Sequence, residues 1–161
     1  EHAAVREGAG VFDVSHMGQL EVTGPGARDG LERILTNDLG IAPGQGQYTL
    51  MLEDDGGVID DLIVYELADR FLLVVNASNV AACHARLAAR LPGDATLVDR
   101  SPETAMLALQ GPAWAEVLRT LCARGDAFAL DYFERSLLPQ LAQNLGQLAT
   151  LAEPQTNLAV A

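Results

Sequence analysis

The chain has 161 residues, of which 49% are apolar and 20% are charged, which is the composition of one globular domain with a hydrophobic core and excludes a disordered chain. Its formal net charge is −12, and all 10 of its basic residues are arginine. Because a surface this acidic repels nucleic acids and anionic membranes, neither is expected as a partner.

Cysteine usage and hydropathy narrow the class further. Cys83 and Cys122 stand alone, without the CxxC spacing of metal or redox sites. Both are therefore expected to be reduced, buried residues of a cytoplasmic protein. A membrane protein is not expected, because no signal peptide is visible and no apolar run approaches the length of a membrane span, about 18 residues.

Turn residues and apolar spacing divide the first part of the chain into four elements. A helix, a segment that enters a turn, an alternating strand and a second helix are predicted over residues 1–8, 11–14, 17–23 and 27–36. On the strand, Leu20 and Val22 form one face, and the opposite face carries Met17, Gln19 and Glu21. On the second helix, the residues expected to face inward are Leu31, Ile34 and Leu35.

Gly24 and Gly26 follow this strand and Gly30 lies in the first turn of the helix, a glycine spacing that superficially resembles a dinucleotide-binding loop. Pro25 removes one of the backbone amides that such a loop offers to a phosphate, and no doubly wound strand order follows. A dinucleotide site is therefore not favoured.

Three strands in succession form the centre of the chain, over residues 48–52, 58–67 and 71–77. Asp60 and Asp61 lie within the middle strand, where successive side chains point to opposite faces. Both faces are otherwise apolar, so at least one carboxylate is expected in a poorly solvated layer, where an unpaired charge is costly. The alternation alone leaves open whether both carboxylates instead stay wet near the mouth of the hairpin.

The next helix is predicted over residues 79–91, with Ser78 or Asn79 as its cap and one face formed by Val80, Cys83, Leu87 and Leu91. Two strands and a further helix follow, over residues 95–99, 104–110 and 112–123. About six strands with three helices between them predict an α+β domain with a mainly antiparallel sheet.

Four stretches resemble the amino-terminal folate-binding region of aminomethyltransferase, the T-protein of the glycine cleavage system; in chain order they read FDVSHMGQLEVTGPGA, PGQGQYTLM, GGVIDDLIVY and LLVVNASN. The resemblance runs from Glu1 to Pro112 and continues more weakly to Phe128. It implies an incomplete copy of the α+β folate-binding domain. It also implies a reaction that moves a one-carbon unit from the aminomethyl-lipoyl arm of H-protein to tetrahydrofolate and releases ammonia.

The resemblance divides the chain into a partial folate-binding domain over residues 1–130 and a divergent segment over residues 131–161. Glu153 is the single charged residue from residue 136 onward, and leucines recur there at helical spacing. This segment is interpreted as a linker or as an amphipathic helix over Pro139–Ala152.

Asp61 aligns with the acidic residue that the family uses at the reacting end of the pterin. A carboxylate at that place accepts a hydrogen bond from the folate amine, orients it and offsets positive charge on the carbon–nitrogen unit. The resemblance therefore makes Asp61 the candidate catalytic residue, and Asp60 is assigned a structural role.

The resemblance implies four further folate contacts, which are Met17, Tyr48, Val74 and Asn76. Tyr48 offers an aromatic ring with a polar tip to the heterocycle. Asn76, with the backbone at Val74, offers a donor and an acceptor to the amide-like edge of the pterin, and Met17 offers a deformable apolar wall. The competing interpretations are a sheet-face tyrosine, a turn asparagine and a core methionine.

The three histidines are not expected to take part in the chemistry. His16 has no partner histidine at metal-ligand spacing and is expected to brace the turn that it occupies. His2 and His84 are expected to be surface or hydrogen-bonded residues of helices. No metal site is predicted.

Two other functions remain open from the sequence. One is a folate-binding module of a sarcosine or dimethylglycine dehydrogenase, in which a flavin domain supplies the one-carbon unit. The other is a non-catalytic relative that binds folate without turnover. The resemblance also implies that contacts to the anionic tail of folate come from sequence that this chain lacks, so the isolated chain is expected to show little or no turnover.

Overall fold

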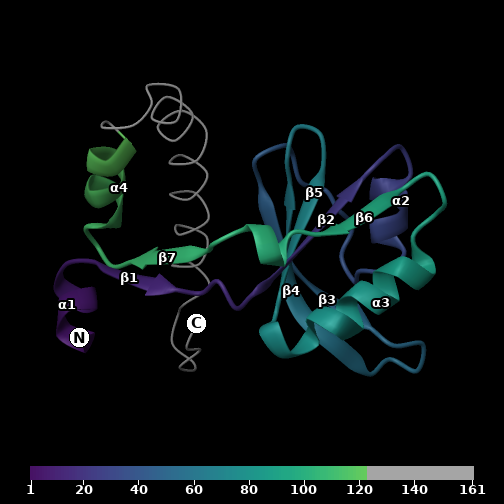
Figure 1. Ribbon diagram of the computed structural model, residues 1–161, viewed down its shortest axis with the longest axis horizontal. Coiled ribbons are helices and arrows are strands. Elements are labelled where there is room, and N and C mark those ends of the chain that lie inside the picture. The colour runs from purple at the N-terminus through teal and green to yellow at the C-terminus, as the bar shows by residue number, and fades with distance from the viewer. Residues whose placement is uncertain (123–161) are drawn as a thin grey trace. The chain divides into compact units, whose positions relative to one another are not determined.

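The structure is a computed structural model, and it describes residues 1–122 (Figure 1). The chain forms two compact units. Among the described residues, one consists of Gly10–Gln110, and the other takes in Glu1–Ala9 and residues 111–122. None of the helices among the described residues combines the length and the apolar character needed to cross a bilayer.

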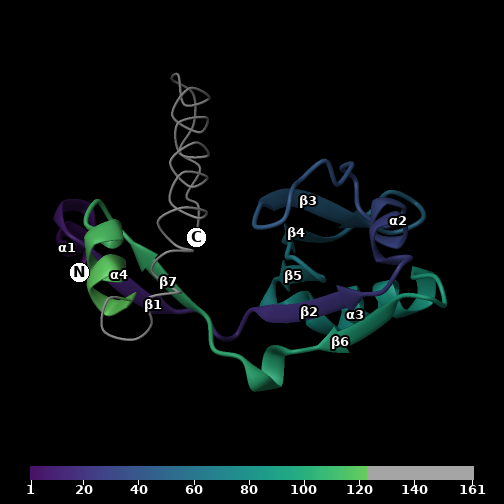
Figure 2. The ribbon, with the colours of Figure 1, turned by 90° about the horizontal axis from the view of Figure 1, so that it is seen from above.

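The larger unit contains a five-stranded sheet in the order β3-β4-β5-β2-β6, in which every neighbouring pair is antiparallel. Figure 2 shows the strands in this order from top to bottom. Their bounds are β2 Gly18–Thr23, β3 Gly46–Leu52, β4 Val58–Glu66, β5 Phe71–Val75 and β6 Thr96–Asp99. Together with the helices of this unit, the sheet confirms the predicted α+β class.

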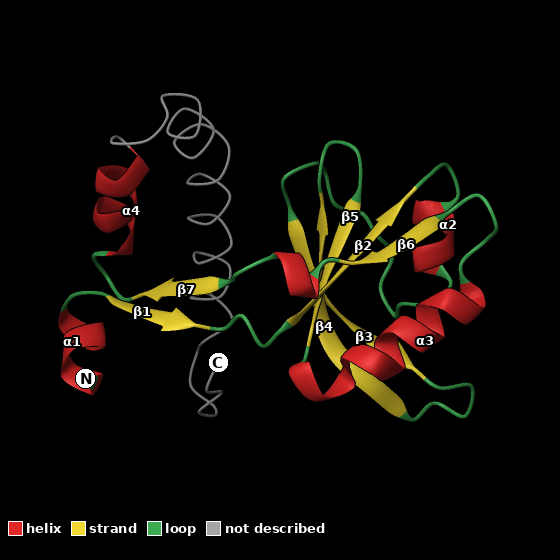
Figure 3. Ribbon diagram, viewed as in Figure 1, coloured by secondary structure: helices red, strands yellow, loops and turns green. Residues whose placement is uncertain are grey.

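Two helices cover one face of this sheet, and Figure 3 shows both on the same side of the strands. They are α2 (Ala27–Glu32) and α3 (Val80–Arg90). The core between sheet and helices is apolar, and its members include Leu20, Val22, Leu31, Met51, Leu62, Val64, Leu73, Val75, Cys83 and Leu87. The predicted inward faces of the strand over 17–23 and of the helix over 79–91 are therefore confirmed. Leu31, Ile34 and Leu35 are also buried in this core, as predicted, but only Leu31 lies within α2.

The remaining elements of the larger unit are short. Strands β1 (Gly10–Asp13) and β7 (Leu107–Gln110) form a separate antiparallel pair, and the 3₁₀ turns η1 (Ala77–Asn79) and η2 (Ser101–Glu103) follow β5 and β6. The smaller unit contains α1 (His2–Glu7) and α4 (Trp114–Cys122), which are linked by a hydrogen bond from Ala113 N to Gly8 O of 3.0 Å.

Two helix predictions need correction. The helix predicted over 27–36 ends at Glu32, because Leu35 forms a bridge to Met51 and the amide of Thr36 donates to the carbonyl of Leu50. The helix predicted from Pro112 begins at Trp114, because Gly111 adopts a φ of 109° and its carbonyl accepts the amide of Trp114.

Two strand predictions also change in extent. The segment over 11–14, expected only to enter a turn, forms β1, and the strand predicted over 104–110 shortens to β7, its partner. The first residues of the predicted strand directly follow η2, where a hydrogen bond of 2.8 Å from Thr104 Oγ1 to Arg100 O closes the turn. The helix predicted over Pro139–Ala152 and the division at residue 131 lie outside the described residues.

The turn between β3 and β4 is held against α3 by Asp54. Gly56 adopts a φ of 91° in this turn, a backbone conformation that favours glycine. Arg86 Nη2 donates to Asp54 Oδ1 at 2.8 Å, and Arg90 Nη2 donates to Asp54 Oδ2 at 2.5 Å. The hydrogen bond and charge of Arg86, followed by the charge of Arg90, hold the pKa of Asp54 below its ordinary 3.8.

An Asp54→Asn variant is expected to be less acid-sensitive than the parent chain. Because the pKa of Asp54 is lowered on folding, its stabilisation is full above the ordinary pKa and disappears as pH falls through the lowered value. Urea unfolding measured from about pH 4 to about pH 2 should therefore show a shallower decline for the variant. Asp38→Asn, at another exposed aspartate, is the control, and parallel curves for Asp54→Asn and the parent would contradict the assignment.

Candidate functional site

The predicted site residues gather on the sheet face opposite α2 and α3, which we call the open face. Tyr48 on β3 pairs with Ile63 on β4, Ile63 pairs with Val74 on β5, and Val74 pairs with Gln19 on β2. Directly paired residues of an antiparallel sheet point to the same face. This row therefore crosses four strands on one side of the sheet.

A second row lies next to the first, two residues away on each strand. Asp61 pairs with Leu50, and Asn76 directly follows β5, two residues after Val74. Met17 and Asn76 flank the last pair between β2 and β5, which joins Gly18 to Val75. The structure thus brings Tyr48, Asp61, Val74 and Asn76 together on the open face and places Met17 at its margin.

Asp61 is exposed and joins two of the other predicted residues. The hydroxyl of Tyr48 donates to Asp61 Oδ2, and Asn76 Nδ2 donates to Asp61 Oδ1 at 3.2 Å. The hydrogen bond to Asp61 is the main reason that the pKa of Tyr48 is raised above 10.0. The phenol therefore stays protonated at neutral pH and continues to donate to the carboxylate.

Asp60 points to the other face and is only 2% exposed. Its Oδ1 accepts hydrogen bonds from Asn76 Nδ2 at 2.9 Å and Asn79 Nδ2 at 2.6 Å. Its Oδ2 accepts one from the amide of Asn76 at 2.9 Å and one from Cys83 Sγ at 3.6 Å. This set of partners answers the question left open by strand alternation, because one carboxylate is buried and hydrogen-bonded while the other is exposed.

The cap of α3 differs from the prediction. Asn79 occupies the N-cap position, but its side chain makes no capping hydrogen bond and instead donates to Asp60. A charged acceptor in the core attracts this amide more strongly than the backbone N–H groups of the first helical turn.

Several residues of the open face were not singled out from the sequence. They include half-buried side chains in the rows of Tyr48 and Asp61 and in the row beyond Tyr48, which are Leu50, Ile63, Tyr65 and Leu72. Gln19 is 6% exposed, and its Nε2 has no hydrogen-bond partner among the described residues. The signal that finds them is residue parity along the strands, once the register of the strands is known.

The turn around His16 and the search for metal ligands bear on the remaining sequence predictions. In the turn that His16 occupies, the hydrogen bonds come from Asp13, which accepts the amide of Ser15 at 2.9 Å, and from Ser15, which receives the amide of Met106 at 3.0 Å. His16 itself is exposed. No group of three or more His, Cys, Asp or Glu residues suited to a metal ion occurs among residues 1–122.

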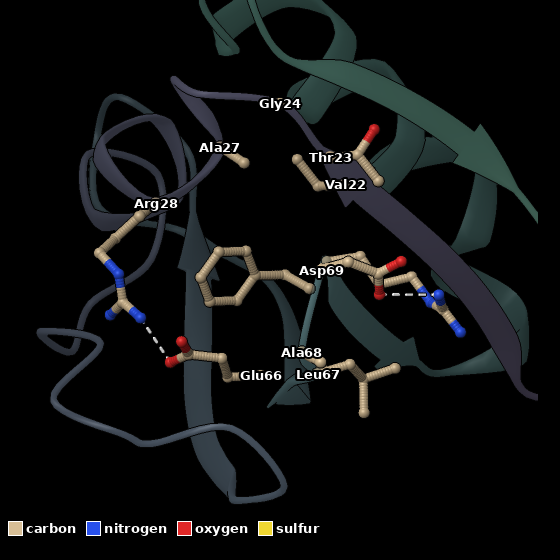
Figure 4. Close-up of a pocket in the computed structure, with 11 residues that line it drawn as sticks. Val22, Thr23, Gly24, Ala27, Arg28, Glu66, Leu67, Ala68 and Asp69 are labelled. Atoms are coloured by element: carbon tan, nitrogen blue, oxygen red, sulfur yellow. Dashed lines mark hydrogen bonds and ion pairs between the residues drawn. The ribbon is translucent and has the colours of Figure 1, made fainter.

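A pocket opens beside the turn that joins β4 to β5, at the end of these strands away from Asp61 and Asn76 (Figure 4). Arg28 pairs there with Glu66 and lies over the ring of Phe71, 5.2 Å from its centroid. Arg70 pairs with Asp69 at 2.9 Å. The charged groups of this pocket are thus paired with each other, and none of the predicted site residues lines it, so the candidate site remains the open face.

Cys83 is expected to resist alkylation in the folded chain. Burial, with the charge of Asp60 as a lesser cause, raises the pKa of the Cys83 thiol to about 12. Because the thiolate is the reactive form, iodoacetamide at about pH 8 should modify Cys83 only when the chain opens. In a Cys122→Ser variant, the modification rate followed by mass spectrometry should rise steeply with urea. Equal rates for folded and unfolded chain would contradict the burial of this thiol.

Comparisons with known proteins agree on one family. A family model described as the GCVT N-terminal domain matches residues 1–136. Proteins named aminomethyltransferase are 49% identical over 134 residues in Parafrankia sp., 50% over 123 residues in Geobacillus kaustophilus and 53% over 143 residues in Chlorobaculum parvum. These alignments cover 82%, 75% and 86% of this chain, but only 37%, 34% and 39% of the relatives.

The fold agrees with a solved structure as well. The crystal structure of glycine cleavage system aminomethyltransferase T from Bartonella henselae matches with a TM-score of 0.66 and 39% identity. The match covers 74% of this chain and 33% of that protein. The chain therefore spans about a third of the length of the relatives that it matches.

Proposed function

Because this chain belongs to the GCVT N-terminal domain family, we propose that its open face is the pterin side of an aminomethyltransferase site. In this proposal, a site that includes the open face transfers a one-carbon unit from the aminomethyl-lipoyl arm of H-protein to tetrahydrofolate and releases ammonia, as in the glycine cleavage system. The protein acts in the cytoplasm, with neither nucleic acid nor membrane as partner. Residues 1–130 form part of the folate-binding domain, and residues 131–161 form a separate segment.

The observation that carries the proposal is the hydrogen-bonded set of Tyr48, Asp61 and Asn76 on one sheet face. Tyr48 is 61% exposed and offers a flat ring beside the half-buried apolar residues Leu50 and Ile63. These surfaces suit a planar heterocycle, while the carboxylate and the amide suit its polar edge. The residues present therefore fit a reduced pterin.

Asp61 is the residue assigned to the chemistry. Tetrahydrofolate, when bound, supplies the amine nitrogens that receive the one-carbon unit. A carboxylate has about four acceptor positions, and the hydrogen bonds from Tyr48 and Asn76 occupy only part of this capacity. The remaining positions accept an N–H of the folate and orient it, and the charge of Asp61 offsets positive charge on the transferred unit.

The names of the relatives favour this proposal over the two alternatives. Each of the three relatives described above is an aminomethyltransferase by name. This supports a donor carried on H-protein over the flavin-linked donor of a sarcosine or dimethylglycine dehydrogenase. It also supports an enzyme over a folate-binding relative without turnover.

The proposal is tested by calorimetric titration of the 161-residue chain with tetrahydrofolate. Weak, saturable binding is expected, and Asn76→Ala should weaken it about 10-fold to 100-fold, because this variant removes a polar contact from the open face. Asn37→Ala is the matched control, since Asn37 accepts a hydrogen bond from Thr49 Oγ1 at 3.2 Å on a different part of the chain. Absence of binding by a chain that circular dichroism shows to be folded would refute a pterin site on this face.

A further inference from the structure

We infer that Asp60 is a positioning residue that fixes the side-chain amide of Asn76 with its carbonyl oxygen toward the open face. The inference rests on the proposed function, because it assigns the polarity of one contact to the folate. With Asp60 in place, Asn76 presents the acceptor Oδ1 and not the donor Nδ2. The ligand group opposite Asn76 is then a hydrogen-bond donor, such as an N–H of the amide-like edge of the pterin.

The first step is that every partner of Asp60 is a donor. Two side-chain amide nitrogens, one backbone amide and one thiol surround its two oxygens, and each oxygen accepts two hydrogen bonds. An ionised carboxylate has only acceptors, so it satisfies all four partners at once. A neutral amide of the same shape would turn its NH₂ group against one pair of donors.

The second step is that Asp60 holds Asn76 at two points. Asn76 donates from its backbone N and from Nδ2, both at 2.9 Å, to the two oxygens of the same carboxylate. Such a two-point contact restrains the backbone and the side-chain torsion together. Because Asp60 is only 2% exposed, water cannot easily replace these hydrogen bonds, and losing them is costly.

The third step concerns the direction of the Asn76 amide. Nδ2 lies 2.9 Å from Asp60 Oδ1, 2.9 Å from the carbonyl oxygen of Asp61 and 3.2 Å from Asp61 Oδ1. Rotation of the amide by half a turn would set Oδ1 against these three oxygens. Within residues 1–122, no hydrogen bond reaches Asn76 Oδ1, so this acceptor is left available for a ligand.

The strand geometry explains why two adjacent carboxylates act on one amide. Asp60 and Asp61 point to opposite faces of β4, and Asn76 lies beyond the end of β5, where its side chain contacts both. Asp61 itself faces the ligand, whereas Asp60 acts only through Asn76. The buried carboxylate thereby determines a hydrogen-bonding pattern on the exposed face.

The test uses Asp60→Asn in the full 161-residue chain, with two independent measurements. In the ligand-free protein, the side-chain amide protons of Asn76 are followed by NMR, and the variant should lose their protection from exchange. In the tetrahydrofolate titration, the variant should bind about 10-fold to 100-fold more weakly, since a hydrogen bond to a correctly oriented group is lost. Circular dichroism identifies conditions under which both proteins are folded.

A double-mutant cycle with Asn76→Ala separates positioning from a general loss of stability. If Asp60 acts through Asn76, adding Asn76→Ala to Asp60→Asn weakens binding by about twofold at most, because the contact is already lost. Cys83→Ala is the matched control, since it removes a donor from the same carboxylate but leaves the bonds to Asn76. Its tetrahydrofolate affinity and its Asn76 amide protection should stay at the parent level.

Three results would each overturn the inference. They are parent-level protection of the Asn76 amide in Asp60→Asn, multiplicative effects of Asp60→Asn and Asn76→Ala on affinity, and equal loss of protection in Cys83→Ala. If the parent chain binds no tetrahydrofolate, the proposed function of this face fails. The NMR comparison of ligand-free proteins still decides whether Asp60 fixes the amide, so the two failures are distinguishable.

Discussion

Replacement of Asp61 by asparagine is expected to slow one-carbon transfer by about 10²-fold to 10³-fold, the loss typical of a group that stabilises developing charge. Asparagine keeps the size of the side chain but removes its charge. It also places an NH₂ group where Asp61 now accepts hydrogen bonds from Tyr48 and Asn76. The folate nitrogen that receives the one-carbon unit would be less well oriented, and positive charge on the transferred unit would lack its counter-charge.

The measurement requires a complete site, which a chimera provides. Residues 1–122 would replace the matching segment of the Geobacillus kaustophilus aminomethyltransferase, to which this chain is 50% identical over 123 residues. Turnover is followed with H-protein and tetrahydrofolate, and Asp38→Asn in the same chimera is the control. A rate for Asp61→Asn close to that of the parent chimera would remove Asp61 from the chemistry. The isolated 161-residue chain is expected to turn over slowly or not at all.

Replacement of Asp60 by alanine should lower the free energy of unfolding by about 3–5 kcal/mol, because several buried donors lose their acceptor at once. The variant leaves four donors from Asn76, Asn79 and Cys83 without their acceptor. Each buried donor without a partner carries a desolvation cost of about 1–3 kcal/mol, reduced where water reaches it.

Asp61→Ala is the matched control for this measurement, because it makes the same change one residue away on the exposed face. Its effect on the free energy of unfolding should stay within about 1 kcal/mol. Urea unfolding of both variants, with unchanged dependence on urea, provides the comparison. Equal destabilisation by the two substitutions would show that the buried hydrogen bonds of Asp60 do not stabilise the fold.

Strand alternation predicts that Asp60 and Asp61 separate, but it does not predict which one is buried. Leu62 and Val64 accompany Asp60, and Ile63 and Tyr65 accompany Asp61, so the two faces of β4 are similarly apolar. Which aspartate is buried is determined by the donors of Asn76, Asn79 and Cys83. They reach Asp60 from 16 to 23 residues further along the chain. Such long-range hydrogen bonds leave no local signal in the sequence.

The contact between Tyr48 and Asp61 was likewise beyond the sequence pattern. Tyr48 pairs with Ile63 and reaches Asp61 diagonally, across one step of the ladder. This arrangement depends on a register shift between Met51 and Leu52 near the hairpin turn. The resemblance to a known family found both residues, whereas the pairing of the strands was needed to show that they touch.

The similarity of the two faces of β4 also has a consequence for how its register is chosen. A slip of one residue turns every side chain to the opposite face, and the apolar character of this strand would oppose that slip only weakly. The slip would, however, take the carboxylate of Asp60 away from its four donors and replace it with that of Asp61 at a shifted height along the strand. The hydrogen bonds to Asp60 therefore exclude the alternative pairing. The buried aspartate thereby selects a single register for the central hairpin.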